Sequence, residues 1–261
     1  MTARTRDRSA LEEATISVIV PFKEGAAARA ACEPLSSLVG LASLVHEVIV
    51  AADSTLSDAA VKTFEGHGLR VHRSDAPRGA RTASAARASS GSGLLFLHAD
   101  TRLAETAITN LEAAFRAGAQ WGAFRLRFED EDGRSCLALV AAAANLRSKC
   151  FGLPYGDQAQ WCRRDAYEEV GGHPPWSFLD DYELAKRLRA IARPWILEPE
   201  ATTSARRYRQ NGIIRCVLRN QLILARHALG ADPNELAKAY RRKVDDALSR
   251  DDHLPTVKGD G

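Results

Sequence analysis

The sequence lacks several features that would assign it quickly to a class of protein. Its five cysteines are scattered over 261 residues, and no two of them form a Cys-x-x-Cys pair. A zinc site or a disulfide framework is therefore not expected, and this cysteine usage is typical of a reducing compartment. The N-terminus has no apolar signal segment, and no apolar run approaches the roughly 20 residues of a membrane span. We therefore expect a cytoplasmic protein.

Two nucleotide-binding fingerprints are also missing. No Gly-x-Gly-x-x-Gly follows the first predicted strand, and Gly-x-x-x-x-Gly-Lys-Ser/Thr occurs nowhere. A nicotinamide-dependent dehydrogenase and a P-loop nucleotidase are therefore not expected. If this chain binds a nucleotide, it uses side chains at the ends of strands.

The charge of the chain is nearly balanced but unevenly distributed. The formal net charge of +3 is too small to predict nucleic-acid binding. Residues 186–226, however, contain ten Lys and Arg residues against only Glu198 and Glu200. Such a block suits anionic partners such as phosphates or lipid head groups, although an ordinary solvated basic face has the same composition.

Strands and helices alternate along the first hundred residues. Apolar runs predict strands at 16–21, 47–52, 69–72 and 94–97, and helical stretches lie between them. This alternation predicts βαβ units and an α/β fold with a mostly parallel sheet flanked by helices. We expect one domain over residues 15–249, between loose tails at 1–14 and 250–261.

The second half of the chain is less regular. We expect helices at 106–118, 135–150, 164–170 and about 180–192, with strands at 120–129 and near 195–197. Two amphipathic helices, 213–229 and one capped by Asp232, close the domain. The domain then divides into a nucleotide-binding half (about 15–101), an acceptor half (about 102–210) and C-terminal helices (about 211–249).

Two polar clusters are candidates for chemistry. The buried strand Leu94–Leu97 ends in His98, Asp100 and Thr101, and ligands of open α/β sheets bind outside the carboxyl ends of strands. His-x-Asp spacing suits a divalent metal that holds a substrate phosphate, although Asp100 could simply cap the next helix. Asp180 and Asp181 could act as a general base and its support, or only favour the dipole of their helix.

Taken together, these segments resemble the family 2 glycosyltransferases of the GT-A (Rossmann-like) fold. The resemblance covers about residues 15–242 and is carried by Ser17–Pro21, Val48–Asp58, Leu94–Thr101, Tyr155–Arg164 with Gly171-Gly172, and Leu179–Leu184 with Lys186-Arg-Leu188. The sequence is most similar to a compact bacterial group that includes arsenosugar-biosynthesis-type glycosyltransferases. That group shares Phe96-Leu-His-Ala-Asp-Thr101, Tyr155-Gly-Asp-Gln158, Thr203-Ser-Ala-Arg-Arg207 and the Leu-Gly-x-Asp-Pro of the closing helices.

The resemblance implies an inverting transferase that takes a sugar from a nucleoside diphosphate sugar, a UDP- or GDP-sugar, to an unknown acceptor. Asp181, with Asp180 beside it, matches the carboxylate that deprotonates the acceptor. Asp100 and His98 match the motif that holds Mn²⁺ or Mg²⁺ on the donor diphosphate. The remaining implied contacts are Pro21, Glu24, Asp53, Arg81, Arg206 and Arg207 for the donor, and Asp157, Gln158 and Trp121 for the acceptor.

The sequence departs from the family pattern at two places. Pro21-Phe-Lys-Glu-Gly25 replaces the usual Pro-x-x-Asn-Glu, and Ala52 stands where the first Asp after strand two belongs, so that Asp53 must compensate. These changes leave open a non-catalytic protein that binds a sugar nucleotide or acts as a scaffold. An aspartate-nucleophile phosphatase is not expected, because His98 stands where that mechanism needs a nucleophilic Asp.

The basic C-terminal helices leave three arrangements open. They could contact a membrane peripherally, form a homodimer, or pack on the sheet. Packing is the default, because most amphipathic helices bury their apolar face within their own domain.

Overall fold

The computed structural model describes residues 14–22, 32–129 and 135–240. The strands are β1 (Ile16–Pro21), β2 (Glu47–Ala52), β3 (Arg70–Arg73), β4 (Gly93–Phe96), β5 (Thr101–Arg102), β6 (Trp121–Phe128), β7 (Trp161–Arg163) and β8 (Trp195–Thr203). The helices are α1 (Cys32–Ala42), α2 (Asp58–Gly66), α3 (Arg78–Ala88), α4 (Thr106–Arg116), α5 (Ser135–Phe151), the 3-10 turn η2 (Gly156–Gln158), α6 (Arg164–Glu169), α7 (Asp180–Ile191), α8 (Arg206–Asn211) and α9 (Ile213–Ala228). Residues 233–240 are also helical.

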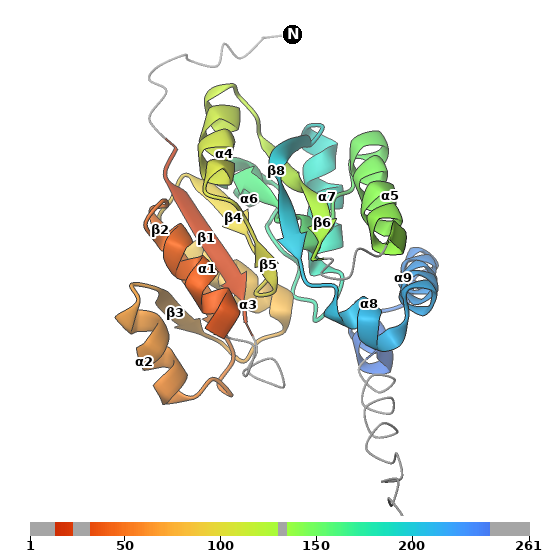
Figure 1. Cartoon of the computed structure of the whole chain (residues 1–261), viewed down its shortest axis with the longest axis horizontal. Helices are drawn as coiled ribbons and strands as arrows, with labels where there is room; N and C mark the ends of the chain where they lie inside the picture. The colour runs from red at the N-terminus through yellow and green to blue at the C-terminus, as the bar shows by residue number, and fades with distance from the viewer. Residues whose placement is uncertain (1–13, 23–31, 130–134, 241–261) are drawn as a thin grey trace, which may run out of the picture.

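The strands form one sheet in the order β3-β2-β1-β4-β7-β6-β8-β5 (Figure 1). Strands β1 to β4 run parallel, as the alternation of strands and helices predicts. Strand β7 then pairs antiparallel with both β4 and β6. The pairing in the sheet therefore changes from parallel to antiparallel at β4. His98 and Asp100 lie just beyond the carboxyl end of this strand.

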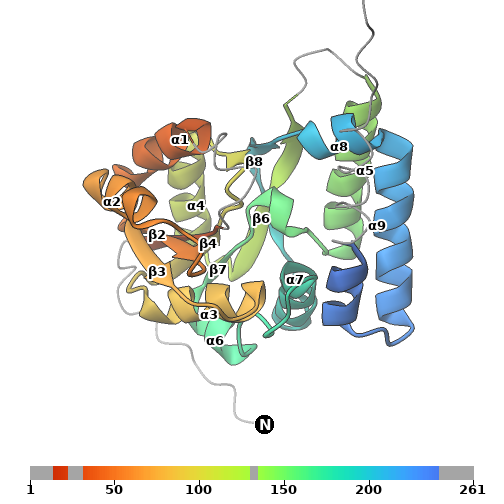
Figure 2. The ribbon, with the colours of Figure 1, turned by 90° about the horizontal axis from the view of Figure 1, so that it is seen from below.

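The helices cover both faces of this sheet. Figure 2 shows α1 and α4 on one face and α3, α6 and α7 on the other, with α5, α8 and α9 grouped beyond β6. Side chains of β1 point alternately to the two faces. Val18 and Val20 belong to the core cluster on the first face, and Ile19 belongs to the cluster on the second. A strand buried on both faces reads as a mainly apolar run, which explains why β1 was predictable.

Strand β8 is longer than the predicted strand near residues 195–197. The strand continues beyond Pro199 because the register with β6 shifts: Phe124 pairs with Leu197, but Leu126 already pairs with Ala201. Residues 198–200 thus bulge opposite Arg125, and a bulge is where a sheet tolerates proline. In the described ranges, no helix has the length and apolar character needed to cross a membrane.

Candidate functional site

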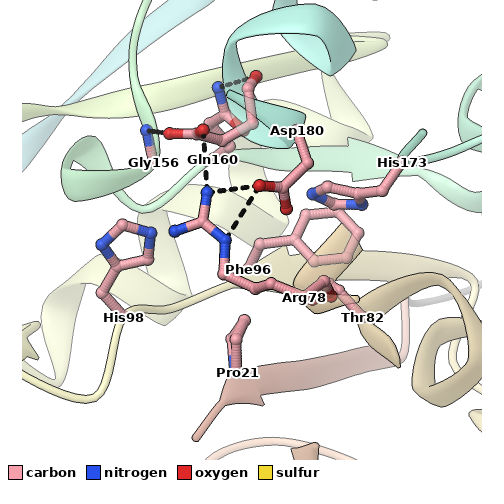
Figure 3. Close-up of a pocket in the computed structure, with 10 residues that line it drawn as sticks. Pro21, Arg78, Thr82, Phe96, His98, Gly156, Gln160, His173 and Asp180 are labelled. Carbon is pink, nitrogen blue, oxygen red and sulfur yellow. Dashed lines mark hydrogen bonds and ion pairs between the residues drawn. The ribbon is translucent and has the colours of Figure 1, made fainter. Parts of the chain in front are cut away.

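The candidate site lies at the carboxyl ends of β1 and β4. Figure 3 shows that Pro21, at the end of β1, and His98, just after β4, face Arg78 and Asp180 across a small pocket. Arg78 opens α3, and Asp180 opens α7. Four segments that are distant in the sequence therefore meet where an open α/β sheet binds its ligands.

Arg78 holds both carboxylates of the Asp180–Asp181 pair. Its Nε donates a hydrogen bond to Asp180 Oδ1 at 2.8 Å, and its Nη2 bonds the same oxygen and also Asp181 Oδ1, the latter at 3.1 Å. The Asp180 side chain is buried, whereas 20% of the Asp181 side chain is exposed. Asp180 thus serves as the buried ion-pair partner of Arg78, whereas the Asp181 carboxylate remains accessible to a ligand.

Gly79 allows this contact. A Cβ at this position would lie 2.0 Å from the carbonyl oxygen of Pro174, and the Gly79 N–H donates a hydrogen bond to the carbonyl of Trp176 at 2.8 Å. The start of α3 therefore lies directly against the loop that precedes α7. Any larger residue would separate Arg78 from the two carboxylates.

Asp181 is held in its ionised form. Burial alone would raise its pKa, but Arg78, His98 and a hydrogen bond of 2.7 Å from the Gly156 N–H to Oδ2 together lower the pKa below its ordinary value. Gln160 fixes the backbone at the same point, because its Nε2 donates to the Asp181 carbonyl at 3.1 Å. The carboxylate is therefore charged and oriented before any ligand arrives.

Gly156 leaves the space in which the side chains of His98 and Asp181 approach each other. A Cβ on Gly156 would lie 2.5 Å from His98 Nε2 and 2.6 Å from Asp181 Oδ2. Both functional side chains thus fill the space that a larger residue at position 156 would take. The imidazole after β4 and the carboxylate of α7 consequently face each other over the turn η2.

A cavity of about 440 Å³ opens from this point. His98, Asp100, Asp157 and Asp181 line one part of it, together with the arginine side chains at the start of α8. Oδ1 of Asp157 is buried without a hydrogen-bond partner. Burial raises the pKa of Asp157, with Asp181 and Asp100 adding to the rise and His98 and Arg147 opposing it. Oδ1 of Asp157 is therefore an acceptor atom without a partner in the cavity wall.

Two residues at this site have left-handed backbone conformations that are unusual outside glycine. Leu179, immediately before α7, has a φ of 58°, and Ala159, immediately after η2, has a φ of 47°. Such conformations cost free energy and persist where the surrounding structure enforces them. The strain lies in the two segments that place Asp181 and Gly156.

The predicted donor residues fall into separate groups. Arg206 and Arg207 line the large cavity and Pro21 lines the small pocket. Asp53 and Arg81 line neither; Arg81 Nη1 lies 3.6 Å from Asp53 Oδ2 in a largely buried ion pair, and Arg81 Nε has no partner. Glu24 lies outside the described residues.

Two predicted acceptor residues do not reach the cavity. Gln158 is buried, its Oε1 accepts a hydrogen bond from the Ser148 hydroxyl at 2.6 Å, and its Nε2 donates to the Phe124 carbonyl at 3.1 Å. Trp121 is also fully buried, and its indole N–H donates to the Ala192 carbonyl at 2.8 Å. Both side chains stabilise the core, so we do not retain them as acceptor contacts; Asp157 does line the cavity.

Arg78, Tyr155 and His173 are site residues that the sequence did not predict. For Arg78 there was a signal, because a cation in the first turn of a helix opposes the helix dipole and so suggests another role. Tyr155 lines the cavity and lies under the guanidinium of Arg147, 3.4 Å from the ring centroid. His173 lines the small pocket, and burial lowers its pKa to about 4.

A divalent cation would find few protein ligands at this site. Within the described ranges, no three His, Cys, Asp or Glu residues lie close enough together to hold a metal ion. His98 and Asp100 both line the cavity, and the oxygen of Asp157 without a partner lies in the same wall. The pair of His98 and Asp100 fits a cation that takes its remaining ligands from a diphosphate, as Mg²⁺ commonly does.

The comparisons with known proteins find similarity only at the level of structure. No protein-family model and no curated protein matches the sequence. The chain is similar to S. aureus TarS 1-349 in complex with UDP-GlcNAc, with a TM-score of 0.56 and 16% identity over 73% of this chain and 58% of that chain. For TarS 1-349 in complex with UDP, the TM-score is 0.55 and the identity 14%, over 73% of this chain and 60% of that chain.

These matches confirm the predicted fold. The chain has the GT-A fold: a mixed α/β architecture with a mostly parallel eight-stranded sheet between helices. It spans less than two thirds of the length of these TarS chains, and only 36% of a longer TarS chain that it matches with a TM-score of 0.53.

Proposed function

We propose that this protein is an inverting, metal-dependent glycosyltransferase that moves a sugar from a nucleoside diphosphate sugar to an acceptor. The observation that carries the proposal is the Asp181 carboxylate, which is held ionised by Arg78 and the Gly156 N–H at the edge of an open cavity. Structures of similar fold contain UDP-GlcNAc and UDP, which supports a nucleoside diphosphate sugar as the donor.

In this mechanism Asp181 is the general base. The acceptor hydroxyl gives its proton to the Asp181 carboxylate while its oxygen forms a bond to the anomeric carbon of the donor sugar. The bond between that carbon and the diphosphate oxygen breaks at the same time, and the nucleoside diphosphate leaves with the electron pair. Arg78 and Gly156 keep the carboxylate oriented toward the reacting atoms, which is a large part of what a positioned base contributes.

The leaving diphosphate needs positive charge near it. His98 and Asp100 would hold Mn²⁺ or Mg²⁺, which when bound offsets the charge on the leaving group. Arg206 and Arg207 line the same cavity, and their guanidinium groups can bind phosphate oxygens bidentately. These residues account for donor binding without a glycine-rich phosphate loop.

A second candidate is a non-catalytic protein that binds a sugar nucleotide. The observation that favours it is the ion pair of Asp53 with Arg81. A carboxylate expected to contact the nucleoside and a guanidinium expected to contact the diphosphate are here partners of each other. Turnover of donor separates the two candidates, because a binding protein would be stabilised by the nucleotide without consuming any nucleotide sugar.

The first experiment measures thermal stability with UDP, GDP and other nucleoside diphosphates, with and without Mn²⁺, for wild type and Asp100→Ala. A nucleotide at about 100 times its dissociation constant adds roughly 2.7 kcal/mol to the stability. We expect a Mn²⁺-dependent shift for one nucleotide that Asp100→Ala loses. Asp181→Asn should keep that shift while donor turnover falls by about 100-fold or more. If no nucleotide raises the thermal stability, both candidate functions are contradicted.

A further inference from the structure

The large cavity has two chemically different halves. We propose that the acceptor is an amphipathic alcohol: its hydroxyl reaches Asp181, and its apolar body lies in the half of the cavity formed by α9, the loop before α7 and the helix at 233–240. This inference rests on the proposed function and adds the chemical class of the acceptor.

The large cavity has room for an acceptor beside the donor diphosphate. His98, Arg78 and Asp181 line both the small pocket and the large cavity, so these side chains stand at the boundary between the two. Asp53 and Arg81, at the end of β2 and in α3, do not line the large cavity. A donor diphosphate held by His98, Asp100, Arg206 and Arg207 would occupy the polar part of the 440 Å³ cavity and leave its apolar part free for a second molecule.

Apolar side chains from three segments line part of the large cavity. They are Phe178, Leu179, Ile223, Leu224, Ala237 and the ring of Tyr240. The hydroxyl of Tyr240 is already bonded by Arg219 Nη2 at 3.2 Å, and its ring stacks at 5.2 Å from that of Phe178. Asn220, on the same face of α9 as Ile223 and Leu224, and Ser177 of the loop before α7 also line the cavity, so its carbon surface is interrupted by two polar side chains. A sugar acceptor would lose hydrogen bonds to water on entering this part of the cavity, whereas an alkyl or aromatic body would gain by burial.

The volume limits what can bind. A cavity of about 440 Å³ lies within the usual range of roughly 300–1,000 Å³ for small-molecule sites. An alcohol with a short alkyl chain or an aromatic ring fits entirely inside. A lipid alcohol would place the first part of its chain here and continue outward. Both share the chemistry proposed, and chain length distinguishes them.

The test uses neighbouring residues of α9 as a matched pair. Ile223 lines the cavity, whereas the Leu222 side chain points outward and is 59% exposed. Calorimetric titration with 1-butanol, 1-hexanol, 1-octanol and 1-decanol measures the affinity of wild type, Ile223→Asp and Leu222→Asp. We expect the wild-type affinity to rise about fourfold for each added methylene. Ile223→Asp should weaken 1-octanol binding at least tenfold, and Leu222→Asp should leave it unchanged.

The dependence on chain length then identifies the kind of alcohol. A plateau before 1-decanol supports an acceptor held wholly inside the cavity, and a continued rise supports a lipid alcohol. Affinity that is independent of chain length would overturn the proposal, as would equal effects of the two substitutions. The nucleotide-induced thermal shift of Ile223→Asp shows that the variant is folded, and Ile223→Ala provides a milder second variant with a smaller expected loss.

The same data separate this inference from the proposed function. If wild type shows no thermal shift with any nucleotide but binds alcohols as expected, the transferase fails and the apolar site stands. If nucleotides bind and the alcohols do not, the inference about the acceptor is wrong and the donor site stands. With the donor known, 1-octanol should accelerate its consumption more than glycerol does.

Discussion

Asp180 and Asp181 are adjacent in the sequence but have different tasks. Asp180 is buried against Arg78, while Asp181 shares that guanidinium, accepts a hydrogen bond from Gly156 and stays accessible from the cavity. The two carboxylates raise the pKa of Arg78 despite its burial, which by itself would lower it. Arg78 is therefore the positive charge that the two carboxylates share.

The first residue-scale prediction therefore concerns Arg78. Arg78→Ala leaves two carboxylates without their common partner, so the free energy of unfolding at pH 7 should fall by about 3–5 kcal/mol. Urea denaturation measures the loss, and Arg215→Ala, at an exposed position of α9, is the control and should change it by less than about 0.5 kcal/mol. Adding Asp180→Asn to Arg78→Ala should recover part of the loss. An unchanged urea midpoint in Arg78→Ala would contradict this assignment.

The second residue-scale prediction concerns His173 and pH. Burial lowers the pKa of His173 to about 4, and Asp180 and Asp181 only partly oppose this effect. In an unfolded chain a histidine titrates near 6.5. Between these values the unfolded state binds a proton that the native state does not, so stability falls as the pH falls through this window.

The loss assigned to His173 should reach about 3 kcal/mol at pH 4. Urea denaturation at several pH values between 7 and 4 measures it for wild type and for His173→Phe. The variant should lose less stability over the same interval, because it has no imidazole to protonate. Parallel pH profiles for the two proteins would show that His173 does not carry the effect.

At the scale of elements, the short turn η2 positions the site as much as any helix does. Gly156→Ala would place a methyl group within 2.6 Å of both His98 Nε2 and Asp181 Oδ2. One of these side chains must then move, and a displacement of about 1 Å at a reacting group can cost about 100-fold in rate. We expect donor turnover to fall by that order.

The control for Gly156→Ala is Gly66→Ala at the end of α2. A Cβ on Gly66 meets nothing within 4 Å and its φ is not in the left-handed region, so this variant should keep both stability and turnover. Turnover assays and thermal unfolding compare the two variants. Full activity in Gly156→Ala would mean that His98 and Asp181 need not meet over η2.

The elements differ in how far the sequence could predict them. Strands β1, β2 and β4 were predictable because burial on both faces makes them mainly apolar runs, broken only by Ser17 in β1 and by Glu47 at the start of β2. Strand β5 and helix α8 were not predicted as elements, since two and six residues are too few to show a period. The sequence also placed His98, Asp100 and the Asp180–Asp181 pair as site candidates, because polar residues directly follow a buried strand or open a helix.

Contacts between residues far apart in the sequence could not be predicted from it. Arg78 and Asp180 are separated by 102 positions, and nothing local indicates that they meet. For Gln158 and Trp121 the sequence predicted a ligand contact that the fold does not provide. A polar or aromatic residue near a motif can equally be buried and donate a hydrogen bond to a backbone carbonyl, as both of these do. Motifs therefore predicted which segments matter, and the fold decided which side chains reach the ligand.

At the scale of the whole molecule, one surface carries large exposed apolar side chains. The side chains of Ile214, Leu218 and Leu222 are 77%, 63% and 59% exposed, and they form a row on the outer side of α9. Arg215 and Arg226 are exposed on the same helix. Apolar side chains with arginines beside them suit the surface of an anionic membrane, where each basic residue contributes about 1 kcal/mol.

Peripheral membrane contact remains a prediction, and this row is where it can be tested. Cosedimentation with vesicles of phosphatidylcholine alone or with phosphatidylglycerol measures binding at low and high salt. We expect binding only to the anionic vesicles, weaker at high salt because the charges are screened, and reduced about tenfold in Leu218→Ser/Leu222→Ser. Vesicle binding that the double variant retains would place the contact elsewhere. If analytical ultracentrifugation instead shows a dimer that the double variant loses, the row is the interface of the homodimer that the sequence also left open.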